Sequence, residues 1–176
     1  ERHEALGRLQ ALEGEVAVVT GATKGIGEAV ARALAEAGAR VAVTSRDPVA
    51  TAAVKPGGDV RYSNTELAEI DTMAVLNLIR GQYAIDSDRI YLMGHSMGGA
   101  GTYYLGGRYH EIWAGLAPIS GAGGIADGTA ERYKSLPTLI MHGAKDSIVP
   151  AGNSRKAVAA LQAVGGLHGH GPHPVL

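Results

Sequence analysis

The segment from Arg89 to Gly101 reads RIYLMGHSMGGAG and carries the strongest structural signal in the chain. Arg89 to Met93 is rich in strand-forming residues, and Gly98 to Tyr104 is predicted to begin a helix. Between them, Gly94-His-Ser-Met-Gly98 has the form Gly-x-Ser-x-Gly, which is typical of a serine on a sharp strand-to-helix turn. We expect a side chain at either glycine to collide with the neighbouring strand and helix, and we expect the turn to lift the Ser96 hydroxyl above the sheet edge.

A second glycine-rich turn, VTGATKGIG, runs from Val19 to Gly27. It follows the β-branched run from Val16 to Val19, which has the composition of a buried parallel strand. A helix is predicted over Glu28 to Ala37 and is expected to end at Gly38. A strand is predicted over Arg40 to Thr44. These elements form a right-handed βαβ unit, which we place at residues 14–47.

Strands and helices continue to alternate through the rest of the chain. The capping-box spacing of Ser63 to Glu66 predicts the start of a helix. The later elements are predicted as strands at Trp113 to Ile119 and Thr138 to Met141, and a helix at Ser154 to Val164. The alternation predicts an α/β fold with an open, doubly wound, mostly parallel sheet and helices on both faces, in three layers.

Composition narrows the class of protein. The 176 residues fit a single α/β domain, in which residues 60–176 would follow the βαβ unit. A net charge of −1 favours neither nucleic acid nor an anionic membrane as partner. Cysteine is absent, so disulfides and thiolate catalysis are excluded. Because no signal peptide and no long apolar run are evident, we expect a cytoplasmic location and no membrane span.

Residues 15–47 resemble the opening of the short-chain dehydrogenases. The resemblance implies a turn that approaches the pyrophosphate of NADP and positive charges beside its 2′-phosphate. The residues that would do so are Gly21, Lys24, Gly25, Gly27 and Arg46. The catalytic Tyr-x-x-x-Lys of that family is missing. We therefore expect the unit to serve as scaffold without a cofactor, with NADP binding as the alternative.

The segment Tyr83 to Tyr104, YAIDSDRIYLMGHSMGGAGTYY, resembles the α/β-hydrolase superfamily. It is closest to the esterase, polyhydroxyalkanoate-depolymerase and prolyl-oligopeptidase-like branches, and the resemblance covers about residues 65–176. It implies a serine hydrolase acting on small carboxylic esters, with Ser96 as nucleophile and Asp146 as triad acid. Asp146 also follows a predicted strand at its carboxyl end, where open α/β sheets place their sites. The alternative role for Asp146 is a turn residue that bonds its own backbone.

The resemblance places the base in the tail, where His170 in Gly-His-Gly is the best match and His168 and His173 are alternatives. Only four residues separate this region from the preceding helix, so the last strand of the family is expected to be absent or very short. We expect His95 and His142 to pack or form hydrogen bonds rather than to react. No metal site is expected, because a cluster of tail histidines has no carboxylate nearby.

The oxyanion hole is expected from the N–H of Met97 together with that of Ala22 or Thr23. This requires the βαβ unit to join the hydrolase-like segment in one sheet of order about 2-1-3-4-5. A misplaced glycine turn would leave a weak or inactive enzyme. The two resemblances abut, which indicates a chimera of two families, natural or engineered. Besides the esterase, the sequence leaves open an NADP-binding module and a scaffold with no activity. A free sheet edge near the tail favours pairing with a second copy.

Overall fold

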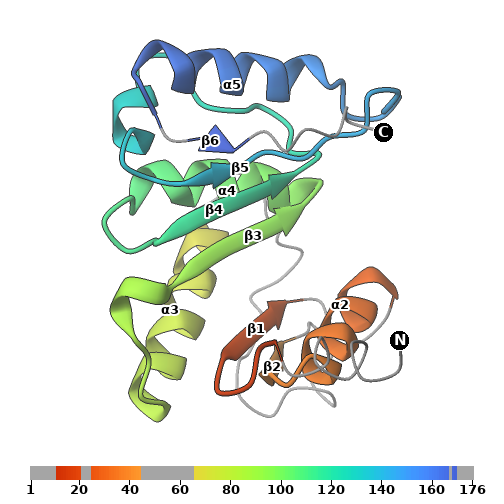
Figure 1. Ribbon diagram of the computed structural model, residues 1–176, viewed down its shortest axis with the longest axis vertical. Coiled ribbons are helices and arrows are strands. Elements are labelled where there is room, and N and C mark those ends of the chain that lie inside the picture. Colours follow the sequence, from red (N-terminus) through yellow and green to blue (C-terminus); the bar gives the residue numbers. More distant parts are fainter. Residues whose placement is uncertain (1–10, 21–24, 45–65, 167, 170–176) are drawn as a thin grey trace. The chain divides into compact units, whose positions relative to one another are not determined.

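The computed structural model describes residues 11–20, 25–44, 66–166 and 168–169, and the chain divides into two compact units, Glu1–Gly58 and Asp59–Leu176 (Figure 1). The other residues, including the loop predicted between Pro48 and Tyr62 and the tail after Gly169, lie outside the described parts. Each unit contains parallel strands and helices, which confirms the predicted α/β class.

The first unit is the predicted βαβ unit. Strand β1 (Val16–Thr20) pairs in parallel with β2 (Arg40–Thr44) over all five residues, and α2 (Gly25–Glu36) connects them. The helix begins three residues earlier than predicted, at Gly25, whose φ of 62° is in the left-handed region that favours glycine. Gly38, with φ of 98°, follows the helix as expected.

The second unit contains a four-stranded parallel sheet of order β3-β4-β5-β6 (Figure 1). Its strands are β3 (Tyr91–His95), β4 (Gly115–Ile119), β5 (Thr138–Leu139) and β6 (His168–Gly169). Its helices are α3 (Glu66–Gln82), α4 (Met97–Arg108) and α5 (Gly152–Ala163), with short 3₁₀ turns η1 (Ser87–Arg89) and η2 (Ala130–Tyr133). The last strand has only two residues, in line with the expectation that it is very short.

The predicted strand neighbours occur within each sheet, because β2 pairs with β1 and the order β3-β4-β5 is continuous. The ladders among the described strands do not include the pairing of β1 with β3 that a single sheet of order 2-1-3-4-5 requires. The reason is that the described strands are divided between two compact units, each with its own sheet.

The core of the second unit lies on one face of its sheet. Leu92, Leu116 and Ile140 point to this face, because they share one parity in the β3-β4-β5 register. All three helices contribute to the same cluster: Leu105 comes from α4, Leu161 from α5, and Met73 and Leu76 from α3. These apolar contacts fix the height of α4 above the sheet, and α4 begins at the serine turn.

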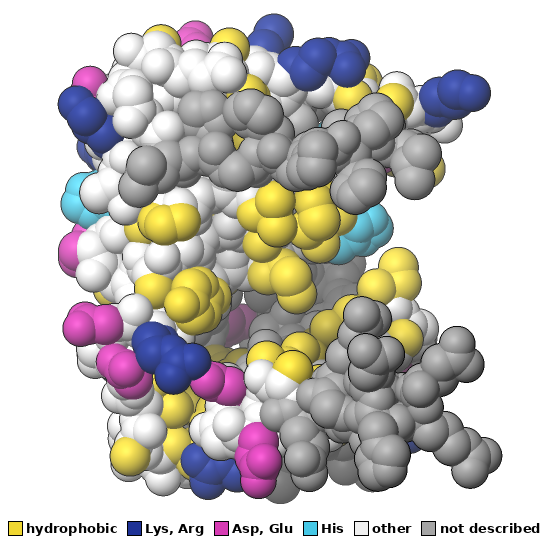
Figure 2. Space-filling view, in the orientation of Figure 1, with side chains coloured by type: hydrophobic (Ala, Val, Ile, Leu, Met, Phe, Trp, Pro, Cys, Tyr) yellow, Lys and Arg dark blue, Asp and Glu magenta, His cyan; other side chains and the backbone are white. Residues whose placement is uncertain are grey.

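The opposite face of this sheet carries apolar side chains that are exposed, and Figure 2 shows hydrophobic side chains gathered on this unit. Tyr91 is 66% exposed, Met93 55% and Leu139 45%. The strand registers place them on one face. Parallel sheets are ordinarily covered on both faces. In the described residues of this unit, the hydrophobic core is therefore one-sided.

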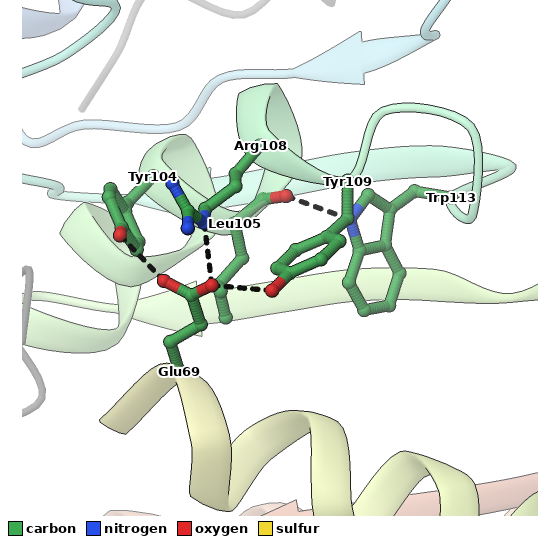
Figure 3. A network of polar contacts seen from close by, with 6 residues as sticks. All are labelled: Glu69, Tyr104, Leu105, Arg108, Tyr109 and Trp113. Atoms are coloured by element: carbon green, nitrogen blue, oxygen red, sulfur yellow. Dashed lines mark hydrogen bonds and ion pairs between the residues drawn. The ribbon is translucent and has the colours of Figure 1, made fainter. Parts of the chain in front are cut away.

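A polar cluster joins α3 to α4 (Figure 3). The buried carboxylate of Glu69 accepts hydrogen bonds from the Tyr104 hydroxyl over 2.6 Å, from Arg108 Nε over 2.5 Å and from the Tyr109 hydroxyl. These contacts, led by the one from Tyr104, hold the pKa of Glu69 below its usual range against the opposing effect of burial. The cluster anchors α3 against the outer side of the helix that follows Ser96.

Candidate active site

Ser96 lies at the junction of β3 and α4 with φ of 57° and ψ of −113°, a conformation that L-residues other than glycine rarely adopt. Serine at a helix N-cap normally bonds a backbone N–H of the first turn. The Ser96 hydroxyl makes no such capping bond. The turn therefore presents a hydroxyl that the helix does not use, as the Gly-x-Ser-x-Gly pattern predicts.

The two glycines of the pattern have different roles. A Cβ on Gly94 would lie 2.2 Å from the carbonyl oxygen of Gly98, so only glycine fits there without a backbone shift. A Cβ on Gly98 would meet no atom within 4 Å outside its own helix. The expectation of a collision at both glycines is therefore wrong for Gly98, because its Cβ direction points into open space.

A second pair of glycines brings α4 close to the end of β4. A Cβ on Gly99 would lie 2.6 Å from the carbonyl oxygen of Ile119, and one on Gly121 would lie 2.7 Å from the carbonyl carbon of Gly99. Both distances are shorter than side-chain carbons tolerate. The first turn of α4 thus approaches the backbone after β4 closely, which fixes the position of the serine turn over the sheet.

Three residues follow the strands at the same level. His95 pairs with Ile119, and Ile119 forms a parallel bridge with Met141. The next residues along each strand are Ser96, Ser120 and His142. Adjacent strands lie ~4.8 Å apart, so the backbones of Ser96 and His142 are about 10 Å apart across the carboxyl edge of the sheet. Of the three, sequence reasoning singled out only Ser96 for chemistry.

Ser120 occupies the middle of this row and is strained. Its φ is 47°, and its N–H donates to the carbonyl oxygen of Met141 over 2.9 Å. Its side chain is buried and lies near the Asp146 carboxylate, and it makes the smallest of the contributions that lower the pKa of that group. The sequence did not single out Ser120, because a positive φ at a residue other than glycine is visible only in the structure.

Asp146 lies in the loop after β5. Its Oδ1 accepts the backbone N–H groups of Ile148 and Val149, each over 2.9 Å. These bonds, with Val149 first, lower its pKa, so the carboxylate stays ionised at neutral pH. Asp146 therefore bonds its own loop, as the alternative role required. Its second oxygen, Oδ2, faces His142 Nε2 at 3.6 Å.

His142 is buried and fully hydrogen-bonded. Its Nδ1 lies 2.7 Å from the Ser154 hydroxyl, and its Nε2 lies 2.7 Å from the carbonyl oxygen of Val149. These hydrogen bonds are the role that was expected of His142. Neither its place beside the Asp146 loop nor its contact with Ser154 was predicted. No spacing in the sequence links residue 142 to residue 154.

The family is decided by comparison with known proteins. The model of the phospholipase/carboxylesterase family matches residues 64–171, more than half of the chain. The chain belongs to this family. The short-chain dehydrogenase model matches residues 15–75, which supports the interpretation of the βαβ unit.

Solved structures agree with this family. A thermostable esterase is 34% identical with a TM-score of 0.55, covering 58% of this chain and 27% of its own. Two further structures share the fold. The esterase domain of a Rhodothermus marinus protein is 18% identical with a TM-score of 0.54, covering 86% of this chain and 72% of its own. The acylaminoacyl peptidase of Pyrococcus horikoshii is 16% identical with a TM-score of 0.62, covering 89% of this chain and 32% of its own.

A curated relative is also an esterase by name. The bifunctional acetylxylan esterase/xylanase XynS20E of Neocallimastix patriciarum is 32% identical over 75 residues, which are 43% of this chain and 11% of that protein. This carboxylesterase-family chain thus spans about a tenth of the curated relative and about a quarter of the thermostable esterase. The comparisons support a hydrolase of the esterase type.

The other candidate residues of this chain lie as follows. Met97 begins α4, where the N–H groups of the first turn have no partner inside the helix. His168 lies in β6 and pairs with Thr138 of β5. The other residues, Gly21, Ala22, Thr23, Lys24, Arg46, His170 and His173, lie outside the described residues; Gly25 and Gly27 form the first turn of α2.

Proposed function

We propose that the chain is a serine carboxylesterase with the triad Ser96, His170 and Asp146. The observation that carries the proposal is the backbone of Ser96, which is strained at the start of α4 and leaves its hydroxyl outside the helix cap. Strain of this kind costs on the order of 1–3 kcal/mol and persists where surrounding structure enforces it. In this chain the bare backbone of Gly94 and the close approach of Gly99 to Gly121 enforce it.

The proposed chemistry is that of a Ser-His-Asp triad. Ser96 Oγ attacks the carbonyl carbon of a small ester while the imidazole of His170 takes its proton, and Asp146 stabilises the imidazolium. Charge develops on the carbonyl oxygen near the amino end of α4, where the helix dipole is positive. The N–H of Met97, at the start of α4, would bind this oxyanion. The imidazolium then protonates the leaving alcohol, and water releases the acid by the same steps, without a cofactor.

Several features support a small-molecule substrate over other partners. The net charge of −1 offers no basis for binding nucleic acid or an anionic membrane. In the parts of the chain that the structure describes, none of the helices has the length and apolar character needed to cross a bilayer. Oligomer formation through the sheet edge at β6 stays a prediction.

Labelling with a fluorophosphonate and hydrolysis of p-nitrophenyl acetate test the proposal. The parent protein is expected to be labelled and active, Ser96→Ala to lose both, and Ser87→Ala, which removes a serine outside the site, to keep both. Alanine variants of His168, His170 and His173 then identify the base, with His170→Ala expected to lose the most. An unlabelled parent, or labelling that survives in Ser96→Ala, would contradict the proposal.

A second candidate function is binding of NADP by the first unit. It is supported by the match of residues 15–75 to short-chain dehydrogenases and by the parallel pair β1 and β2, connected by α2, which starts at Gly25 with a positive φ. Calorimetry with NADPH tests it: binding that weakens in Arg46→Ala supports it, and absence of heat contradicts it. If labelling and binding are both absent, the chain is an inactive scaffold, as a chimera of two families could be.

A further inference from the structure

A buried histidine lies directly behind the proposed acid. The side chain of His142 is 3% exposed, and both of its ring nitrogens lie 2.7 Å from oxygen atoms. His142 follows β5, Ser154 comes from α5, and Val149 belongs to the loop that carries Asp146. The imidazole therefore connects the loop of the acid to a helix of the core.

The neighbours of the ring determine where its protons lie. A carbonyl oxygen can only accept, so Nε2 must carry the hydrogen that it donates to the oxygen of Val149. In the neutral ring Nδ1 is then an acceptor and receives the hydroxyl proton of Ser154. The neutral tautomer with its hydrogen on Nε2 thus satisfies both ring nitrogens, and the carbonyl of Val149 selects it.

A further polar group, the hydroxyl of Tyr103, lies in the core beside Ser154. The Tyr103 hydroxyl is completely buried and has no partner at hydrogen-bond distance in the structure. Burial raises the pKa of Tyr103, and the adjacent Ser154 hydroxyl opposes part of that rise. The Tyr103 hydroxyl thus lies beside the hydrogen-bonded pair of Ser154 and His142 without completing a hydrogen bond to it.

Val149 connects His142 to the proposed acid, Asp146. Its carbonyl oxygen accepts from His142, and its own N–H donates to Asp146 Oδ1 over 2.9 Å. Fixing Val149 therefore fixes one carboxylate oxygen. The other oxygen, Oδ2, is left for a further partner, with His142 Nε2 at 3.6 Å, too long for a hydrogen bond.

We propose that His142 is a positioning residue of the esterase: its Nε2–H holds the carbonyl of Val149, which holds Oδ1 of Asp146 and leaves Oδ2 to the catalytic base. The inference rests on the proposed triad for its kinetic consequences. Its structural content, a carboxylate held by a loop that a buried imidazole fixes, does not depend on activity.

The kinetic test compares His142→Ala, His142→Gln and Ser154→Ala with the parent. Displacing a catalytic group by about 1 Å can cost on the order of 100-fold in rate, so His142→Ala is expected to lower kcat by about 10- to 100-fold with KM nearly unchanged. The ascending limb of the pH profile is expected to move to lower pH, because a displaced carboxylate stabilises the imidazolium less. Glutamine can still donate to Val149 and is expected to restore most of kcat. Ser154→Ala is expected to act in the same direction but less.

A matched control is His110→Ala, which removes an exposed histidine paired with Glu111 and is expected to change neither kcat nor the pH limb. If His142→Ala keeps the parent kcat and pH profile while Ser96→Ala is inactive, the positioning role is wrong although the triad stands. Should His142→Ala fail to fold, the glutamine and Ser154 variants decide the question by the same readouts.

A second measurement works even if the chain is not an esterase. Carboxyl titration of ¹³C-labelled aspartate by NMR follows Asp146 directly. Its pKa is expected to rise in His142→Ala, since the backbone bonds from Val149 and Ile148 that lower it would loosen. It is expected to stay unchanged in His110→Ala. An Asp146 that titrates identically in the parent and in folded His142→Ala would overturn the inference.

Discussion

The backbone N–H of Ser96 donates a hydrogen bond of 2.8 Å to the carbonyl oxygen of Ile119. The ladder between β3 and β4 thus extends one residue beyond the end of β3. The Ser96 carbonyl in turn accepts the N–H of Ala100 over 3.0 Å, as the first bond of α4. The strained residue is therefore held on both sides by backbone groups, and its side chain takes no part in building the turn.

Replacing Ser96 is consequently expected to remove activity without loss of the fold. Loss of the nucleophile in a serine hydrolase typically costs on the order of 10⁶ in kcat. Ser96→Gly should also be more stable than Ser96→Ala, by about 1 kcal/mol, because glycine adopts a positive φ without strain. Thermal unfolding of the two variants measures the difference. Equal stabilities would mean that the backbone at residue 96 relaxes when the hydroxyl is removed.

The two glycines that flank the serine provide a matched pair of substitutions. Gly94→Ala is expected to destabilise the protein and to abolish labelling of Ser96, because its Cβ would overlap the Gly98 carbonyl. Gly98→Ala is expected to be tolerated, and its higher helix propensity favours the folded state by up to ~1 kcal/mol. Urea unfolding and fluorophosphonate labelling of both variants check this. A Gly98→Ala variant as damaged as Gly94→Ala would contradict the asymmetry.

Glu69 predicts a dependence of stability on pH. Its folded-state pKa is lowered, chiefly by Tyr104, so its contribution is present above its ordinary value of 4.5 and is lost as the pH falls through the folded pKa. The melting temperature of Glu69→Gln should be lower than that of the parent at pH 7, and the gap should narrow in acid. Asp146 titrates in both proteins, so its effect cancels. Glu131→Gln, at an exposed pair with Lys134, is the control and should show no such gap.

Tyr133 ties η2 to α4 through a buried hydroxyl, which donates to the carbonyl oxygen of Tyr103 over 2.6 Å. Burial raises the pKa of Tyr133 to about 12, so the hydroxyl stays protonated as a donor throughout the neutral range. Tyr133→Phe is expected to cost about 1 kcal/mol. Denaturant unfolding measures it against Tyr91→Phe, an exposed tyrosine whose loss should cost little. An unchanged midpoint in Tyr133→Phe would show that the bond adds nothing net.

Local patterns in the sequence were sufficient for the βαβ unit and for the serine turn. The bounds of β2 were predicted to the residue, because a β-branched run after a glycine is a signal carried by adjacent residues. Strand β3 begins two residues later than predicted and ends at His95, because Arg89 belongs to η1 and Ile90 precedes the ladder. Strand β5 is shorter than predicted, with Met141 joined only by a single bridge.

Contacts between distant residues could not be read in the same way. Glu69 meets Tyr104, Arg108 and Tyr109 across 35 to 40 residues, and nothing in the spacing of α3 indicates which of its carboxylates turns inward. The clamp between His142 and Ser154 likewise depends on how α5 packs beside β5. The proposed base at His170, outside the described residues, stays a prediction from the family resemblance.

The close approach of Gly99 to Gly121 has a consequence for protein engineering. Each residue occupies the space where the other would need a methyl group. The position of the reactive hydroxyl therefore depends on bare backbone outside the pentapeptide, at Gly99 directly after it and at Gly121 beyond β4. Transplanting only Gly-x-Ser-x-Gly into a new sheet would omit the close backbone contact that holds the turn in place. A graft has to bring the bare backbone at the end of the adjacent strand as well.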